Sequence, residues 1–171
     1  MSHLVGLAPA LPRHGYRQEE ITAMLAELLQ PSGHERALMH RVHASAGVRT
    51  RHLTLPLGEY GRLDSFDTAN ALFLSEGLEL AADALGKALA DAGLIPRDVD
   101  VLVFTSVTGV SAPSLDAALV DRLALRPDVR RMPSFGLGCA GGAAGLALAH
   151  ALLAGRPHGV RERVDVGHGT R

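Results

Sequence analysis

Apolar residues recur at helical spacing from the start of the chain. From Ile21 to Leu29 they fall at i, i+3, i+4, i+7 and i+8, which predicts an amphipathic helix over residues 17–29. A second helix is expected over 34–45. A long third helix is expected over 66–92, because Asp64 or Ser65 can cap it and Gly93 can end it. Two more helices are predicted, over 115–124 and from Cys139 to Ala154.

One segment is apolar without alternation. Residues 99–107 have the pattern of a β-strand whose two faces are both covered by helices. A shorter strand is predicted over 129–134, an extended segment over 48–55 and a loop over 57–64. The alternation of helices and strands predicts an α/β fold in layers, with a mixed or parallel sheet.

The composition fits one domain or a part of a larger one. The chain has 171 residues, of which 47% are hydrophobic, so it can bury a core. Its net charge of −1 gives no indication of a nucleic-acid or anionic-membrane partner. The single cysteine excludes an intrachain disulfide, and the N-terminus lacks the pattern of a signal peptide. Both observations fit a cytoplasmic location.

Two further patterns in the chain resemble a membrane span and a metal site. The stretch 137–154 is nearly uncharged and has Gly141 and Gly145 at GxxxG spacing. Most of it is Ala or Gly, which gain little on transfer to lipid, so we expect a buried central helix and no membrane span. Three histidines lie close together, but there is no HExxH pattern or acid pair near them, so no metal site is predicted. They are His34, His40 and His43.

Cys139 lies in a glycine-rich turn between a predicted strand and a predicted helix, and three interpretations compete. The turn matches G-x-G-x-x-G, which indicates dinucleotide binding, but no suitable ribose-binding acid follows. The cysteine can also be an inert core residue. As a third alternative it is a nucleophile, because a helix start favours the thiolate and backbone N–H groups of a sharp turn can hold an oxyanion.

Three motifs in register carry a family resemblance. Residues 135–146 (FGLGCAGGAAGL) and 107–116 (VTGVSAPSLD) resemble segments of type III polyketide synthases, the chalcone-synthase-like family. Residues 123–131 (LALRPDVRR) are similar to the segment that joins them, and residues 47–53 (GVRTRHL) resemble bacterial members in particular. The resemblance runs in order from about residue 4 to about residue 160, and three motifs in register are more specific than the glycine turn alone.

The resemblance implies a thiolase-like layered αβα fold, of which this chain is the N-terminal half, and a homodimer. It implies that Cys139 accepts an acyl group from a starter acyl-CoA and that malonyl-CoA then extends it, with coenzyme A thioesters as substrates and no permanently bound cofactor. Thr108 then lies near the reaction cavity, and Ser111 and Ala112 lie where the family reaches the partner's cavity. Arg49 or Arg51 meets the coenzyme A phosphates; the alternative is a surface charge for each arginine and a turn residue for Thr108.

The chain departs from the family pattern at two points. The His and Asn that polarise the malonyl carbonyl belong to the C-terminal half, and none of the nine histidines here lies in a matching motif. Residues 161–171 form a polar tail where an apolar core strand is expected, so the thiolase-like domain is assigned to 1–160. We expect a truncated product whose last residues are out of frame, without condensing activity. Reading the downstream DNA in the other two frames tests this.

Two further functions therefore stand beside the acyltransferase. One is a non-catalytic remnant or interaction protein that keeps part of the thiolase-like fold. The other, suggested by the glycine turn alone, is a dinucleotide-binding oxidoreductase. Mass spectrometry after incubation with an acyl-CoA distinguishes the acyltransferase from the non-catalytic remnant, because only an acyltransferase gains a thioester on Cys139.

Overall fold

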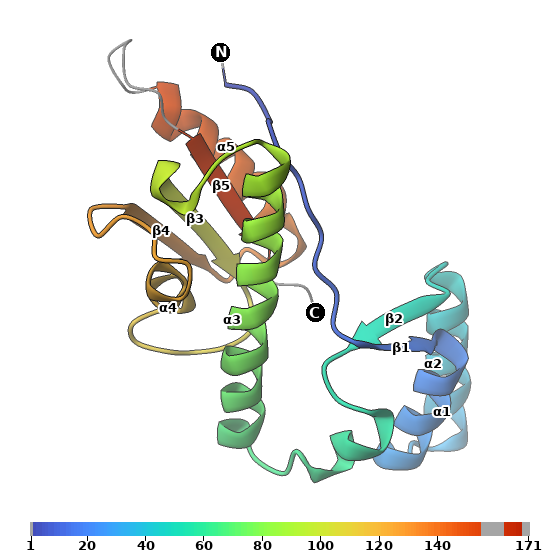
Figure 1. Cartoon of the computed structure of the whole chain (residues 1–171). Coiled ribbons are helices and arrows are strands. Elements are labelled where there is room, and N and C mark those ends of the chain that lie inside the picture. Colours follow the sequence, from blue (N-terminus) through green and yellow to red (C-terminus); the bar gives the residue numbers. More distant parts are fainter. Residues whose placement is uncertain (1, 155–162, 169–171) are drawn as a thin grey trace. The chain divides into compact units, whose positions relative to one another are not determined.

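The computed structural model of the chain describes residues 2–154 and 163–168 (Figure 1). These residues form two compact units. One unit consists of residues 11–69, and the other of the remaining described residues.

The smaller unit joins a two-stranded sheet to two helices. β1 (His14–Arg17) pairs antiparallel with β2 (Thr50–Leu53). α1 (Gln18–Leu29) follows β1 directly, and α2 (Gly33–Ser45) begins with a capping box, in which the carboxylate of the third helical residue accepts a hydrogen bond from the Ser32 N–H. The two helices predicted here are confirmed within one residue. Residues Leu57–Arg62, predicted as a loop, form a short 3₁₀ helix, η1.

The larger unit is a layered α/β structure with a three-stranded parallel sheet of order β4-β3-β5. The predicted strand over 99–107 is the central strand, and the register pairs Val101 with both Arg130 and Val164. The main helices of this unit also form where they are expected. The bounds are α3 (Phe66–Asp91), β3 (Val99–Ser106), α4 (Leu115–Arg122), β4 (Arg130–Phe135), α5 (Gly141–Ala154) and β5 (Arg163–His168).

The fifth strand corrects one prediction. The polar composition of 161–171 argued against a core strand, but Arg163–His168 forms β5 and pairs parallel with β3 along its length. Backbone pairing needs only N–H and C=O groups, which every residue except proline carries, so a polar segment can add to a sheet beside an apolar central strand. The predicted boundary at 160 falls among residues 155–162, outside the described residues, as does Gly155, the predicted helix stop.

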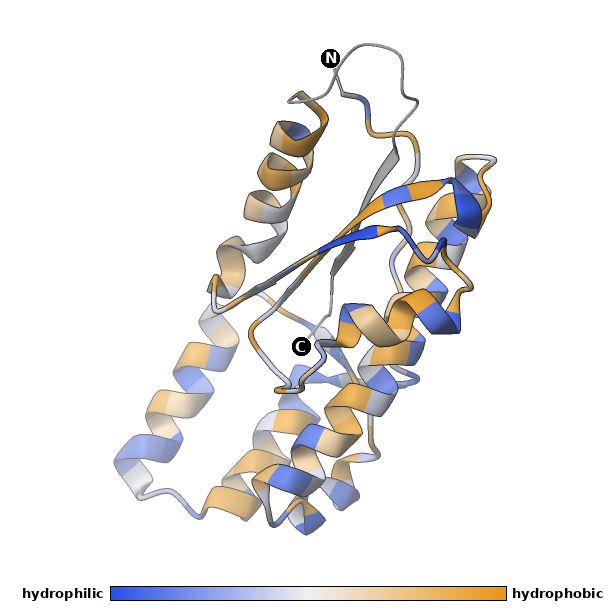
Figure 2. Ribbon diagram, turned by 90° about the vertical axis from the view of Figure 1, so that its left-hand side faces the viewer, coloured by the Kyte–Doolittle hydropathy of each residue, from blue (hydrophilic) through white to orange (hydrophobic). Residues whose placement is uncertain are grey.

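β3 is buried on both faces because helices cover the sheet on both sides (Figure 1). Leu102 and Phe104 pack in one cluster with residues of α3 and α4, while Val101 and Val103 pack against Ala149 of α5. Figure 2 shows that α5, the helix that leads into the grey trace, is hydrophobic along most of its length. This arrangement is the αβα layering that the family resemblance implied. Among the described residues, no helix has the length and apolar character needed to cross a membrane.

An ion pair joins α3 to α4 on one face of the sheet and makes the stability of the fold depend on pH. The Arg122 guanidinium of α4 donates two hydrogen bonds to the Glu79 carboxylate of α3, at 2.8 and 2.9 Å, and these bonds lower the pKa of Glu79. A carboxyl whose pKa is lowered by folding stabilises the fold above its unfolded pKa, and this contribution is lost as the pH falls through the folded pKa.

We therefore expect E79Q to be less stable than the wild type at pH 7, by a small amount because both side chains are exposed. The difference shrinks as the pH is lowered toward 3, since the wild-type carboxyl is then protonated as well. Thermal unfolding of both proteins across this pH range measures it. A difference that stays constant with pH contradicts the role assigned to the pair.

Candidate functional site

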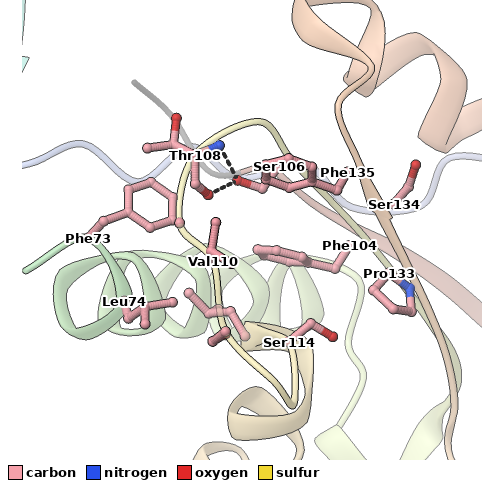
Figure 3. Close-up of a pocket in the computed structure, with 13 residues that line it drawn as sticks. Phe73, Leu74, Phe104, Ser106, Thr108, Val110, Ser114, Pro133, Ser134 and Phe135 are labelled. Carbon is pink, nitrogen blue, oxygen red and sulfur yellow. Dashed lines mark hydrogen bonds between the residues drawn. The ribbon is translucent and has the colours of Figure 1, made fainter. Parts of the chain in front are cut away.

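The loop that follows β3 begins with a tight side-chain turn. The Ser106 hydroxyl donates a hydrogen bond to the Thr108 carbonyl oxygen at 2.6 Å and accepts one from the Thr108 N–H at 3.1 Å (Figure 3). Serine commonly forms such local bonds to backbone two residues away, which bends the chain as it leaves a strand. These two bonds close a tight turn over residues 106–108.

The next residue requires glycine for two reasons. Gly109 has φ +80°, which a residue with a side chain adopts only with strain. A Cβ atom at this position would lie 2.2 Å from Cδ1 of Phe73, whose ring comes from α3. The backbone therefore lies directly on the aromatic ring, and no larger residue fits there unless the ring or the loop moves.

The middle of the loop is attached to α3 through one side chain. The Asn70 Oδ1 accepts a hydrogen bond from the Val110 N–H at 2.7 Å, and the Asn70 Nδ2 donates to the Val110 carbonyl oxygen at 2.9 Å. Both backbone polar groups of Val110 are thus satisfied by one amide.

The end of the loop is attached to β4 through a buried carboxylate. Asp116, in the first turn of α4, is fully buried. It accepts a short hydrogen bond from the Ser114 hydroxyl, and Arg131 of β4 donates to its second oxygen at 3.1 Å. The pair connects the end of the loop to the strand that precedes the glycine turn.

These elements enclose a pocket of about 330 Å³ beside the C-terminal ends of β3 and β4. The C-terminal edge of a parallel sheet is where α/β folds commonly bind ligands. Figure 3 shows the ring of Phe73 and the side chain of Leu74 extending from α3, with Phe104 between them and Pro133. The lining is mainly apolar and includes several hydroxyl groups. They belong to Ser106, Thr108, Ser111, Ser114 and Ser134.

Cys139 lies in the turn between β4 and α5. Gly136 and Gly138 have φ of +87° and +57°, so both adopt the positive-φ conformation that glycine tolerates and that the glycine-rich pattern indicates. Residues Gly138–Ala140 form a single 3₁₀ turn, η3, and α5 begins at Gly141. Cys139 is exposed and is therefore not a core residue of the described structure.

The first residue of α5 lies against the central strand. A Cβ atom on Gly141 would lie 3.3 Å from Oγ1 of Thr105, a contact tighter than most real side chains make. Thr105 is buried, and its hydroxyl has no hydrogen-bond partner among the described residues. Glycine at this position therefore lets α5 begin close to the sheet directly after Cys139.

The structure brings together some of the predicted site residues. Thr108 and Ser111 line the pocket, whereas Ala112 and Cys139 are not among its lining residues. Phe135 does line it, and Cys139 follows Phe135 across the glycine turn.

The two predicted arginines belong to the smaller unit, at residues 11–69. Both are exposed. Arg51 Nε donates a hydrogen bond to Oε1 of Gln18 at 2.6 Å, and the carbonyl oxygen of Arg49 accepts one from the Gln18 N–H at 2.8 Å. These contacts fix β2 against the start of α1. The exposed side chain of Arg51 thus also makes a contact within its own unit.

Asn70, Phe73 and Asp116 are among the residues of this site that the sequence patterns did not indicate. Asn70 had a weak signal, because it is a polar residue inside an otherwise apolar helical stretch. Its partner is far away in the sequence, and nothing local identifies it. Within the described residues, no group of three or more His, Cys, Asp or Glu side chains is arranged to hold a metal ion.

Comparisons with known proteins agree with this architecture. Residues 2–166 match the model of the N-terminal domain of chalcone and stilbene synthases. A 1,3,6,8-tetrahydroxynaphthalene synthase of Streptomyces peucetius subsp. caesius is 55% identical over 148 residues, which cover 86% of this chain and 39% of the relative. This chain thus spans about 40% of the length of the curated relatives it matches.

Solved structures give the same result. The crystal structure of 1,3,6,8-tetrahydroxynaphthalene synthase from Streptomyces coelicolor A3(2), a bacterial type III polyketide synthase, superimposes with a TM-score of 0.81 at 28% identity, covering 90% of this chain and 44% of that one. A CsyB mutant complexed with CoA-SH gives 0.80 at 28% identity, over 88% and 41%. The fold is the N-terminal half of the thiolase-like fold, and the chain belongs to the chalcone and stilbene synthase family of type III polyketide synthases.

Proposed function

We propose that this chain supplies the acyl-accepting part of a type III polyketide synthase, with Cys139 as the residue that carries the acyl group. The observation that carries the proposal is the exposed thiol in a turn of two left-handed glycines, immediately before α5. Cys139 lies just before the first turn of α5, where backbone N–H groups without helical partners can stabilise the oxyanion of an attacked carbonyl. Membership of the family favours acyl transfer over the dinucleotide interpretation of the same turn.

The loading step is a thioester exchange. The Cys139 thiolate attacks the carbonyl carbon of an acyl-CoA, and a new C–S bond forms to Cys139. The bond to the sulfur of coenzyme A then breaks, and coenzyme A leaves as a thiolate that takes up a proton. One thioester replaces another of similar energy, so this step needs no oxidant, metal or further cofactor.

The remaining assignments follow from the same proposal. Thr108 and Ser111 contribute hydroxyl groups to the substrate cavity, and Ala112 lies beside them in the chain. Arg49 and Arg51 bind the phosphates of coenzyme A, for which exposed guanidinium groups are suited because they donate hydrogen bonds in a planar fork. The substrates are a starter acyl-CoA and malonyl-CoA, and the family's working form is a cytoplasmic homodimer. A structure that matches this chain contains coenzyme A, which supports the choice of substrate class.

The test is covalent labelling. After incubation with acetyl-CoA or malonyl-CoA, we expect the intact mass of the chain to rise by one acyl group, and peptide mapping to place that group on Cys139. C139A and C139S are the matched controls and should gain nothing, because alanine has no nucleophile and serine is a much weaker one at neutral pH. We expect no polyketide product from these 171 residues alone, since condensation requires further groups that polarise the malonyl carbonyl.

An unlabelled chain that is shown to be folded would contradict the proposal. That result favours the alternative of a non-catalytic protein that keeps part of the thiolase-like fold. An acyl group found equally on C139A would also contradict it, since the label would then be on another side chain.

A further inference from the structure

One wall of the pocket is a loop, residues 107–113, without helical or strand structure. The apolar side chain at its centre is a weak anchor. Val110 is 60% exposed although it lines the pocket, so burial of its side chain holds it only weakly. Contacts other than burial of the Val110 side chain are therefore needed to keep this wall in place.

The bonds to Asn70 supply that attachment. The side chain accepts from the Val110 N–H at 2.7 Å and donates to the Val110 carbonyl at 2.9 Å. An amide suits this position because it carries one donor and one acceptor on the same carbon. A carboxylate would present two acceptors, one of which would face the carbonyl oxygen, and an aliphatic side chain would leave both backbone groups unmatched.

The paired hydrogen bonds between Asn70 and Val110 form a clamp, and the position of Asn70 on α3 connects this clamp to the pocket. Phe73 and Leu74 lie three and four residues further along the same helix, and so on the same face, and both line the pocket. Phe73 contacts Gly109, the residue before Val110. Thus one face of α3 fixes two successive residues of the loop, one through a ring contact and one through paired hydrogen bonds.

We propose that Asn70 is a positioning residue, which holds residues 107–113 as a wall of the pocket and thereby fixes where Thr108 and Ser111 present their hydroxyl groups. The clamp itself follows from the geometry. Its meaning for a substrate rests on the proposed function, because only that function makes the pocket a substrate cavity.

The test measures hydrogen exchange of the Val110 amide by NMR, expressed as a protection factor so that intrinsic exchange rates at each pH are divided out. We expect N70A to lower the protection factor of Val110 at least about tenfold, while the amides of β3 keep theirs and show that the fold is intact. S75A, which removes a hydrogen bond between a serine and its own helix, is the control on α3 and should leave Val110 unchanged.

N70D separates a specific clamp from a general loss of packing. At pH 7 its carboxylate repels the Val110 carbonyl, and protection is low. As the pH falls through the pKa of the introduced carboxyl, which facing a carbonyl raises above the usual ~3.9, the neutral acid has one donor and one acceptor and protection returns. The loop has no titratable side chain, and Asp67, one turn earlier on α3, is present in the wild type and in N70A as well. Neither the wild type nor N70A should gain protection on acidification.

Two outcomes would overturn the inference. One is a protection factor for Val110 in N70A within twofold of the wild type. The other is an N70D protein whose protection does not change with pH while β3 stays protected. Acyl labelling of Cys139 in the same variants is a separate measurement: if the wild type cannot be labelled but the exchange results hold, the proposed function fails and the clamp stands.

Discussion

G109A is expected to lower the free energy of unfolding by about 2–5 kcal/mol. The left-handed backbone at φ +80° costs a residue with a Cβ about 1–2 kcal/mol, and inserting a methyl group against packed atoms costs about 1–3 kcal/mol more. Here the added Cβ would lie 2.2 Å from a ring carbon of Phe73, so the ring or the loop must move. Urea unfolding followed by circular dichroism measures the change.

The same unit offers a matched control. Gly93 has φ +67°, but a Cβ atom there would meet nothing within 4 Å. G93A therefore carries the backbone strain without the contact, and we expect it to cost only about 1–2 kcal/mol. If the two variants were equally stable, the ring contact would have no energetic effect, and the close packing of the loop on α3 would be contradicted.

R131A is expected to cost about 2–4 kcal/mol, because it leaves the carboxylate of Asp116 fully buried without its cationic partner. The Ser114 hydroxyl still donates to this carboxylate, and Arg131 itself is 38% exposed, so the loss should fall short of that for a wholly buried pair. The loop should loosen with it, since Asp116 joins the end of the loop to β4. Urea unfolding gives the stability, and exchange of the loop amides gives the loosening.

Arg130, the exposed neighbour on the same strand, provides the control, and R130A should change stability by less than about 0.5 kcal/mol. A double-mutant cycle with D116N then isolates the pair. The double variant should be more stable than the sum of the two single losses predicts, because removing both partners leaves no uncompensated buried charge. Strict additivity would mean that Asp116 and Arg131 do not stabilise each other.

Much of this fold could be predicted from hydrophobic patterning. The uninterrupted apolar run of β3 indicated a strand covered on both faces, and Leu102 and Val103 are completely buried on opposite sides of it. β1 and β5 were not predicted. Each is short and polar, and each exists because a partner strand far away in the sequence offers it backbone hydrogen bonds. Local patterning contains no information about such a partner.

The candidate site also has residues that the sequence could locate and residues that it could not. Glycine spacing located the turn around Cys139, and the positive φ angles of Gly136 and Gly138 are the physical reason that glycine was needed there. The motif 107–116 located Thr108 and Ser111, which line the pocket. Asn70 and Asp116 act through partners forty and fifteen residues away, so their roles became visible only in three dimensions.

The central position of β3 also has a consequence for how the chain acquires its structure. Val101 pairs with Arg130 on one side and with Val164 on the other. The partner strands of the two edges of β3 are therefore synthesised at different times as the chain emerges from the ribosome. The β3–α4–β4 crossover can form first, with α3 covering one face of it. The other edge of β3 stays unpaired until β5 is available. Pairings that span long stretches of chain form slowly, so we expect β5 to join last and that edge of β3 to be the site of transient misfolding.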